Sequence, residues 1–173
     1  MNLAYRQLNS IELTQILREN NDTCAVSEIK FFDLLYEYEE GKVSIYFCAF
    51  NEERLVGVAK LKTGGSDSIS APGWNTFLCS VSVRDKYYGN GIGQSLLNNL
   101  LSYCAVNKLK VIVPAYSVRG WKHLRQPLYD IAKELNVEIF DQSTMPTYFE
   151  WKTCEGYNAE EYDEIKASFS LPK

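Results

Sequence analysis

Three glycines lie where a predicted strand meets a predicted helix. Residues 77–83 form an apolar run typical of a buried strand, and residues 95–107 have the spacing of an amphipathic helix. Gly89, Gly91 and Gly93 fall between them. The first turn of a helix carries backbone N–H groups without internal partners and a partial positive charge. Because glycine lets a ligand approach the main chain closely, we predict a phosphate-binding site at this junction.

The spacing of the glycines excludes two common phosphate-binding loops. A P-loop ends in Gly-Lys-Ser/Thr, whereas Gly93 is followed by Gln94 and Ser95. A Rossmann fingerprint has the pattern Gly-x-Gly-x-x-Gly and an acidic residue about 20 residues later. This chain has Gly-x-Gly-x-Gly, and residues 108–114 contain no acid. A glycine-rich turn without a ligand is the remaining alternative to another class of phosphate site.

Residues 83–93 resemble the acetyl-coenzyme A loop of the GNAT superfamily of N-acetyltransferases. The family pattern is Val-x-x-x-x-Arg/Gln-x-x-Gly-x-Gly/Ala, at the end of the fourth strand and the start of the next helix. In this chain Val83 is followed by Tyr88, Gly89, Asn90, Gly91, Ile92 and Gly93 in the matching positions. Tyr88 stands where the family usually has Arg or Gln. Since backbone amides bind most of the phosphate in that family, the resemblance holds despite this departure.

The order of the predicted elements extends the resemblance to residues 3–152. We predict strands at 3–8, 43–50, 55–62, 77–83, 108–113, 137–140 and 147–152, and helices at 11–19, 27–38, 95–107, 121–135 and 155–168. Up to residue 152 this gives β-α-α-β-β-β-α-β-α-β-β, which is similar to the GNAT arrangement. The resemblance implies an α+β fold of three layers, with helices flanking a central mixed, twisted sheet of six to seven strands. We expect one domain over residues 1–173, of which 153–173 form a C-terminal extension.

Three local details follow from residue types within these elements. Ser10 is the expected N-cap of the first helix. The strand–helix–strand unit at 77–113 implies parallel neighbouring strands joined by a crossover. Pro127 predicts either a kink in the helix 121–135 or a helix that starts afresh there.

Composition narrows the class of protein. Of the 173 residues, 46% are hydrophobic and 23% are charged, and the formal net charge is −4, which is ordinary for a globular domain. Extensive nucleic-acid contact relies on clustered Lys and Arg, so the acidic balance argues against it. No apolar run is long enough to cross a bilayer, and the first residues lack the pattern of a signal peptide. We expect a cytoplasmic protein that binds neither nucleic acid nor a membrane.

The cysteines and the single histidine do not predict a metal site. Five cysteines are widely spaced without a C-x-x-C pair, and His123 is the one histidine. This pattern predicts neither a zinc site nor a disulfide framework, and the thiols are expected to be small apolar side chains in a reducing compartment. A nucleophilic pair of Cys79 and His123 is an alternative interpretation.

The resemblance also implies where acetyl-CoA binds. Its pyrophosphate would lie on the amides of residues 88–94. Its pantetheine arm would follow the strand at 79–83, which in the family carries a bulge and separates from the next strand. A backbone N–H near Val81 or Ser82 would stabilise the oxyanion. The residues expected at the cofactor are Val81, Val83, Tyr88, Gly89, Asn90, Gly91, Ile92, Gly93 and Gln94.

The sequence indicates the catalytic residues less clearly than the cofactor-binding residues. Many family members carry a Glu on the fourth strand at the position of Cys79, so Glu150 and Asp141 are the alternative general bases. The usual general acid is a Tyr in the helix after the fifth strand, where strict alignment gives Leu124. The nearest tyrosines are Tyr129, our first choice, and Tyr116. For each of these side chains a surface or packing role is the alternative, as it is for His123.

The function implied by the resemblance is transfer of an acetyl group from acetyl-CoA to a primary amine, by direct attack in a ternary complex. The acceptor would be a small molecule or a protein. Two alternatives stay open. Tyr88 and Cys79 fit a catalytically degenerate module of the same fold that binds CoA or another protein. An acyltransferase acting on nucleic acid is the other, although the acidic composition argues against it. The sequence leaves the oligomeric state open, a homodimer included.

Overall fold

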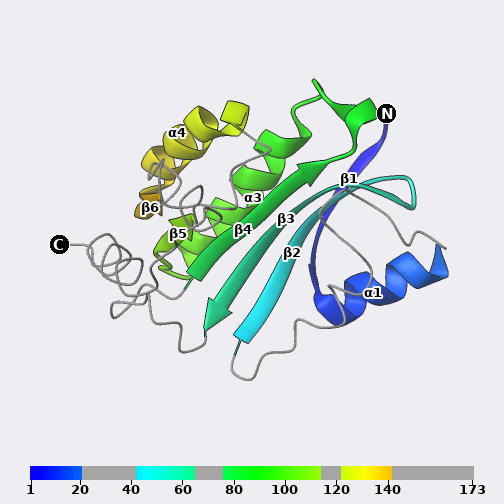
Figure 1. Ribbon diagram of the computed structural model, residues 1–173, viewed down its shortest axis with the longest axis horizontal. Coiled ribbons are helices and arrows are strands. Elements are labelled where there is room, and N and C mark those ends of the chain that lie inside the picture. Colours follow the sequence, from blue (N-terminus) through cyan, green and yellow to red (C-terminus); the bar gives the residue numbers. More distant parts are fainter. Residues whose placement is uncertain (21–41, 65–75, 114–121, 142–173) are drawn as a thin grey trace, which may run out of the picture.

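The structure is a computed structural model, which describes residues 1–20, 42–64, 76–113 and 122–141 (Figure 1). The strands are β1 (Leu3–Asn9), β2 (Lys42–Asn51), β3 (Arg54–Gly64), β4 (Thr76–Val83), β5 (Val111–Val113) and β6 (Ile139–Asp141). The helices are α1 (Ser10–Glu19), α3 (Ile92–Val106) and α4 (Arg125–Leu135), with short 3-10 helices η1 (Asp85–Tyr87) and η2 (Lys122–Leu124). The predicted helices at 27–38 and 155–168 and the predicted strand at 147–152 lie outside the described residues.

The strands form one mixed sheet in the order β1-β2-β3-β4-β5-β6. Strands β1 to β4 are antiparallel neighbours, whereas β5 is parallel to β4, and β6 is parallel to β5. The prediction of parallel strands on either side of the glycine helix is therefore confirmed. Because β4, β5 and β6 run in the same direction, their carboxyl ends meet at one edge of the sheet.

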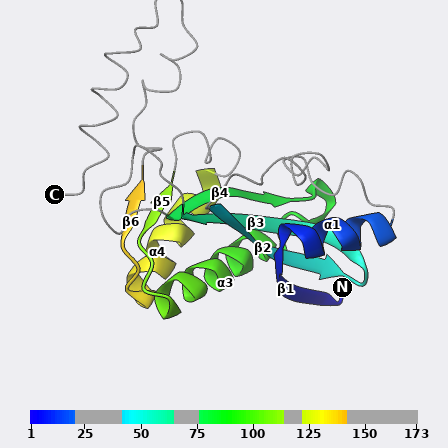
Figure 2. The same ribbon diagram turned by 90° about the horizontal axis from the view of Figure 1, so that it is seen from below.

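Helices cover both faces of the sheet, which gives the three layers that the family resemblance implied (Figures 1 and 2). On one face α1 buries Leu13 and Leu17 in a cluster that includes Phe50 of β2. On the other face α3 and α4 lie together and bury Leu97 and Leu128 in the main core. Burying a side chain of this size contributes about 1.5–3 kcal/mol, so the apolar stripes of these helices fix the layers. Within the described part of the chain, no helix is long and apolar enough to cross a membrane.

The start of α1 differs from the sequence-based expectation. Its N-cap is Asn9, so the prediction of Ser10 was wrong. The Asn9 side chain accepts a hydrogen bond from the backbone N–H of Glu12 at 2.8 Å, and the Glu12 carboxylate accepts one from the backbone N–H of Asn9 at 2.8 Å. This reciprocal pair is a capping box, and a Glu three residues after Asn9 was its signal in the sequence.

The helix that contains Pro127 starts afresh rather than kinking. Residues 122–124 form η2, and α4 begins at Arg125, so Pro127 lies in the first turn of α4. An N–H group in the first turn has no intrahelical acceptor, so proline loses no hydrogen bond there. The second of the two alternatives for Pro127 is confirmed.

Candidate active site

The glycine loop leads from β4 through η1 into α3, as predicted, but α3 begins at Ile92 rather than at residue 95. Gly89 and Gly91 have φ angles of 80° and 72°, in the left-handed region that favours glycine. A Cβ placed on either residue would meet no atom within 4 Å. These two glycines therefore bend the backbone while the space beside them stays open. No side chain of the described residues caps α3, so its first N–H groups are available to a ligand.

Gly93 differs from Gly89 and Gly91 because it lies at a close contact between helices. It is the second residue of α3, and a Cβ there would come within 3.0 Å of Leu124 Cδ1. Leu124 belongs to η2 and is buried in the main core. Gly93 thus allows the start of α4 to pack closely against the first turn of α3. The sequence assigned all three glycines to the ligand, whereas Gly93 also serves helix packing.

Side chains around the loop fix its shape. Asn90 donates from Nδ2 to the carbonyl oxygens of Tyr87, at 3.0 Å, and of Tyr88, at 3.3 Å. Asn51, at the end of β2, donates from Nδ2 to the phenol oxygen of Tyr87 at 3.3 Å. The Asn51 hydrogen bond is the main cause that lowers the pKa of Tyr87 below its usual value. The loop is therefore held from inside by Asn90 and from the β2–β3 hairpin by Asn51.

Strand β4 carries a bulge before it reaches the loop. Lys60 of β3 pairs with Ser80 and Leu61 pairs with Leu78, which leaves Cys79 as the extra residue. On its other side β4 pairs with β5 only at Thr76 and Phe77. Among the described residues no strand lies along that side of residues 78–83, so backbone N–H and C=O groups there are available to a ligand. This is the bulged, separated strand that the resemblance implied.

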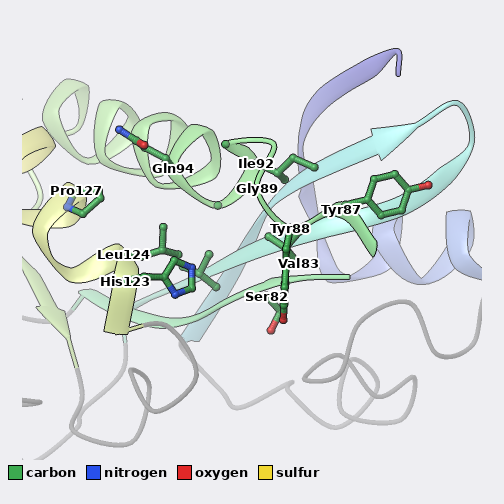
Figure 3. Close-up of a pocket in the computed structure, with 13 residues that line it drawn as sticks. Ser82, Val83, Tyr87, Tyr88, Gly89, Ile92, Gln94, His123, Leu124 and Pro127 are labelled. Carbon is green, nitrogen blue, oxygen red and sulfur yellow. The ribbon is translucent and has the colours of Figure 1, made fainter. Parts of the chain in front are cut away.

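The glycine loop and the open edge of β4 line one cavity of about 500 Å³ (Figure 3). The residues predicted for the cofactor all line it except Asn90, whose side chain closes the loop instead. The lining residues are Val81, Ser82, Val83, Tyr87, Tyr88, Gly89, Gly91, Ile92, Gly93, Gln94, His123, Leu124 and Pro127. His123, Leu124 and Pro127 form a wall that the predicted cofactor-binding residues did not include, although Leu124 stands at the aligned general-acid position and His123 was an alternative catalytic residue. No local pattern near the glycine loop marks them, because only tertiary packing brings η2 and α4 there.

Neutral groups dominate the lining of the cavity. Among the described residues that line it, the titratable side chains are Tyr87, Tyr88 and His123, and none is a carboxylate, Lys or Arg. A hydrogen bond with Asp85 is the main cause that raises the pKa of Tyr88, so this phenol keeps its proton. An anion in the cavity would therefore depend on backbone amides and on the dipole of α3 rather than on a cationic side chain of this lining.

Tyr129 lies outside this lining, in a contact between α4 and β6. Its hydroxyl donates a hydrogen bond to Asp141 Oδ2, and Arg125 Nε lies 3.5 Å from the same oxygen. Burial raises the pKa of Tyr129 to about 12, and the Asp141 carboxylate adds to the effect. Asp141, an alternative general base, has a side chain only 5% exposed and also does not line the cavity. The general-acid role of Tyr129 stays a prediction.

The other catalytic candidates are placed as follows. Tyr116 and Glu150 lie outside the described residues. Cys79 is half-buried at the β4 bulge and is not among the residues that line the cavity, whereas His123 is. In the described part of the chain no cluster of three or more His, Cys, Asp or Glu residues could hold a metal ion.

Comparison with known families agrees with this geometry. The model of the acetyltransferase (GNAT) family matches residues 11–115, which is more than half of the chain. The chain belongs to the GNAT family. Acyl transfer is the general activity of this family. In this GNAT chain the glycine loop and the open edge of β4 line the cavity. A search of curated proteins finds no match.

Two solved structures are similar to this GNAT chain. A ribosomal-protein-alanine N-acetyltransferase from Brucella melitensis biovar Abortus 2308 is 13% identical with a TM-score of 0.48, over 73% of this chain and 90% of that chain. An acetyltransferase from Trypanosoma brucei is 17% identical with a TM-score of 0.36, over 91% of this chain and 94% of that chain.

Proposed function

We propose that this protein is an acetyl-CoA-dependent N-acetyltransferase that acetylates a primary amine of a small molecule or a protein. One observation carries the proposal: the amino end of α3 and the open edge of β4 line the same cavity. Acetyl-CoA combines a pyrophosphate, which needs N–H donors, with a pantetheine arm whose amide groups need a strand-like partner. The cavity offers both kinds of partner side by side.

The residues present fit acetyl-CoA in shape and chemistry. Gly89 and Gly91 leave open space where other residues would place a Cβ, so a phosphate could approach the amides of residues 88–94. Val81 and Val83 are the apolar part of the wall beside the open strand edge. A volume of about 500 Å³ is in the usual range for a pocket that holds a small molecule or cofactor. When bound, acetyl-CoA supplies an acetyl group activated as a thioester.

In this proposal the protein contributes mainly binding and orientation. The amides of the loop hold one end of the donor, and the edge of β4 holds its arm, so the thioester is fixed for attack. Fixing two reactants in one geometry removes several kcal/mol from a bimolecular barrier, roughly 7–11 kcal/mol in favourable cases. A backbone N–H near Val81 or Ser82 would stabilise the oxyanion of the tetrahedral intermediate. The mechanism is direct attack of the amine in a ternary complex, without a covalent enzyme intermediate.

Calorimetry with CoA and an amine panel with acetyl-CoA test this proposal. Free thiol and acetylated product would be measured together, the second by mass spectrometry. We expect CoA to bind and at least one primary amine to be acetylated. CoA binding without turnover of any amine would support the degenerate module instead. Acetyl transfer only to RNA or DNA, with a steep dependence on salt, would support the nucleic-acid alternative.

A further inference from the structure

His123 is a titratable side chain that lines the cavity and has no part in the proposed binding of acetyl-CoA. It belongs to η2, its side chain is exposed, and it lines the cavity together with Ser82 and Val83 of β4 (Figure 3). No described residue forms a hydrogen bond or ion pair with its imidazole. Histidine is the side-chain type whose charge changes most readily near neutral pH, and it is the commonest general acid and base.

The position of His123 is fixed by its neighbour. Leu124 follows it directly, is buried in the main core and packs against Gly93 at the start of α3. Because Leu124 anchors η2 to the glycine helix, His123 lies on a packed element beside the cavity. A proton donor must be held near the reacting atom, and a packed element beside the cavity provides a firm support for such a donor.

The phenols near the cavity already have partners. Tyr129 donates a hydrogen bond to Asp141, outside the cavity lining. Tyr87 accepts a hydrogen bond from Asn51, and Tyr88 interacts with Asp85. His123 is thus the side chain of the described lining that combines an open position with an imidazole, the commonest group in general acid and base catalysis.

We propose that His123 protonates the thiolate that leaves when the acetyl group is transferred; this inference rests on the proposed function. The amine nitrogen forms a bond to the carbonyl carbon, and the electron pair of the C=O π bond moves to oxygen. When that pair returns, the C–S bond breaks and its electrons stay on sulfur. The imidazolium N–H proton then moves to sulfur. The amine nitrogen loses one proton as the amide forms, and this loss balances the proton that the neutral imidazole takes up again. The products are the N-acetyl amine and CoA with a free thiol.

His123 faces the acyl donor rather than the acceptor. It shares its cavity with the glycine loop and with Val81 and Val83, the residues assigned to the donor. Other titratable or charged groups near it are Tyr87 and Tyr88 across the cavity and Arg125 on α4, whose Nε lies 3.5 Å from Asp141 Oδ2. Arginine keeps its charge at all relevant pH values, and the ordinary pKa of a tyrosine is about 10. A pH dependence near neutrality that disappears with the imidazole would therefore report on His123.

Kinetics of His123→Gln and His123→Ala provide the first test. We expect kcat to fall about 100-fold, the lower end for a general acid because a thiolate is a tolerable leaving group, with little change in KM for acetyl-CoA. The limb of the pH profile near neutrality should vanish, and added imidazole should restore part of the activity of His123→Ala. Gln126→Ala is the control, since Gln126 is exposed on α4 and outside the cavity lining. Wild-type kcat and pH profile in His123→Gln would overturn the proposal.

A second test does not need turnover. Because His123 is the one histidine of the chain, its ring signals in the NMR spectrum of the untagged protein are assigned without mutation. The imidazole would be titrated with CoA bound and with desulfo-CoA bound, which lacks the sulfur. We expect the pH titration of the imidazole to have a different midpoint in the two complexes, and equal titration midpoints would overturn the proposal. A sulfur-dependent midpoint without turnover of any amine would refute the proposed function and leave the contact between His123 and sulfur standing. Failure to bind CoA would refute both.

Discussion

Asn51 donates a hydrogen bond from Nδ2 to the phenol oxygen of Tyr87, 36 residues further along the chain and 3.3 Å away. The other end of the same amide, Asn51 Oδ1, accepts a hydrogen bond from the backbone N–H of Asn2 at 3.3 Å. Tyr87 in turn packs against the main core and lines the cavity. A single amide at the end of β2 therefore joins Asn2, just before β1, to the loop that is proposed to hold the cofactor.

The bond between Asn51 and Tyr87 predicts how the loop is supported. Tyr87→Phe and Asn51→Ala should each weaken CoA binding several-fold, because the loop loses an anchor while its amides stay intact. The double variant should bind no worse than the weaker single variant, since both changes remove the same bond. Calorimetry with CoA measures these affinities, with Tyr5→Phe, an exposed tyrosine of β1, as the control. Additive losses in the double variant would show that the two residues act separately.

The positive φ of Gly91 predicts two separable effects of substitution. At φ 72° a side chain costs about 1–2 kcal/mol of strain, so Gly91→Gln and Gly91→Glu should both lower the free energy of unfolding. Only Gly91→Glu places a carboxylate where the phosphates are proposed to lie, and it should abolish CoA binding. Denaturant titrations and calorimetry would be run on the same samples. Equal CoA affinities for the Gln and Glu variants would argue against an anion at this position.

Gly57 of β3 packs closely against the start of α3 at the same site. A Cβ on Gly57 would lie 2.9 Å from Ile92 Cγ2 and 3.4 Å from the carbonyl oxygen of Ser82. Ile92 is the first residue of α3 and lines the cavity, so Gly57→Ala should push the start of the helix outward. We expect a loss of about 1–3 kcal/mol in the free energy of unfolding.

Ile92→Leu provides the matched test, because it removes the methyl group that the new Cβ would meet. The double variant with Gly57→Ala should be more stable than the sum of the two single changes predicts, by at least about 0.5 kcal/mol. Chemical denaturation of the four proteins gives this coupling energy. Purely additive effects would mean that the two residues do not contact each other closely.

The sequence revealed the site only as far as local patterns reach. The glycine loop could be located because a φ near 70–80° and a helix N-terminus both leave a local signature, as Gly89 and Gly91 do. The start of α3 was placed three residues late, because the first apolar contact of the helix, Ile92, stands among glycines. Asn9 was missed as a cap because Ser10, next to it, is also a good capping residue.

The missing part of the site depends on packing between distant segments. His123 and Leu124 reach the cavity because Gly93 lets η2 approach α3, and nothing in their own neighbourhood indicates this contact. For Tyr129, helical periodicity predicts a position on α4, but its partner comes from β6. Asp141 stands at the carboxyl end of β6, which is parallel to β5, and only the sheet order places it beside α4.

The hydrogen bond from Tyr129 to Asp141 predicts a dependence of stability on high pH. The phenol ionises near pH 10 in the unfolded chain and near pH 12 in the folded protein. The folded state therefore binds more protons between these values, and the stabilisation from this group is complete below pH 10 and is lost as pH rises towards 12. Tyr129→Phe should lower the free energy of unfolding at pH 8 by only about 1 kcal/mol, because the phenol is partly exposed. Above pH 10 the stability of this variant should fall less steeply than that of the wild type. Denaturation of both proteins at pH 8, 10 and 11 measures the difference, and turnover of the same samples separates structure from chemistry.

With His123 as the proton donor, Tyr129→Phe should keep its kcat within a few-fold; a drop of about 100-fold with wild-type stability would instead make Tyr129 the general acid.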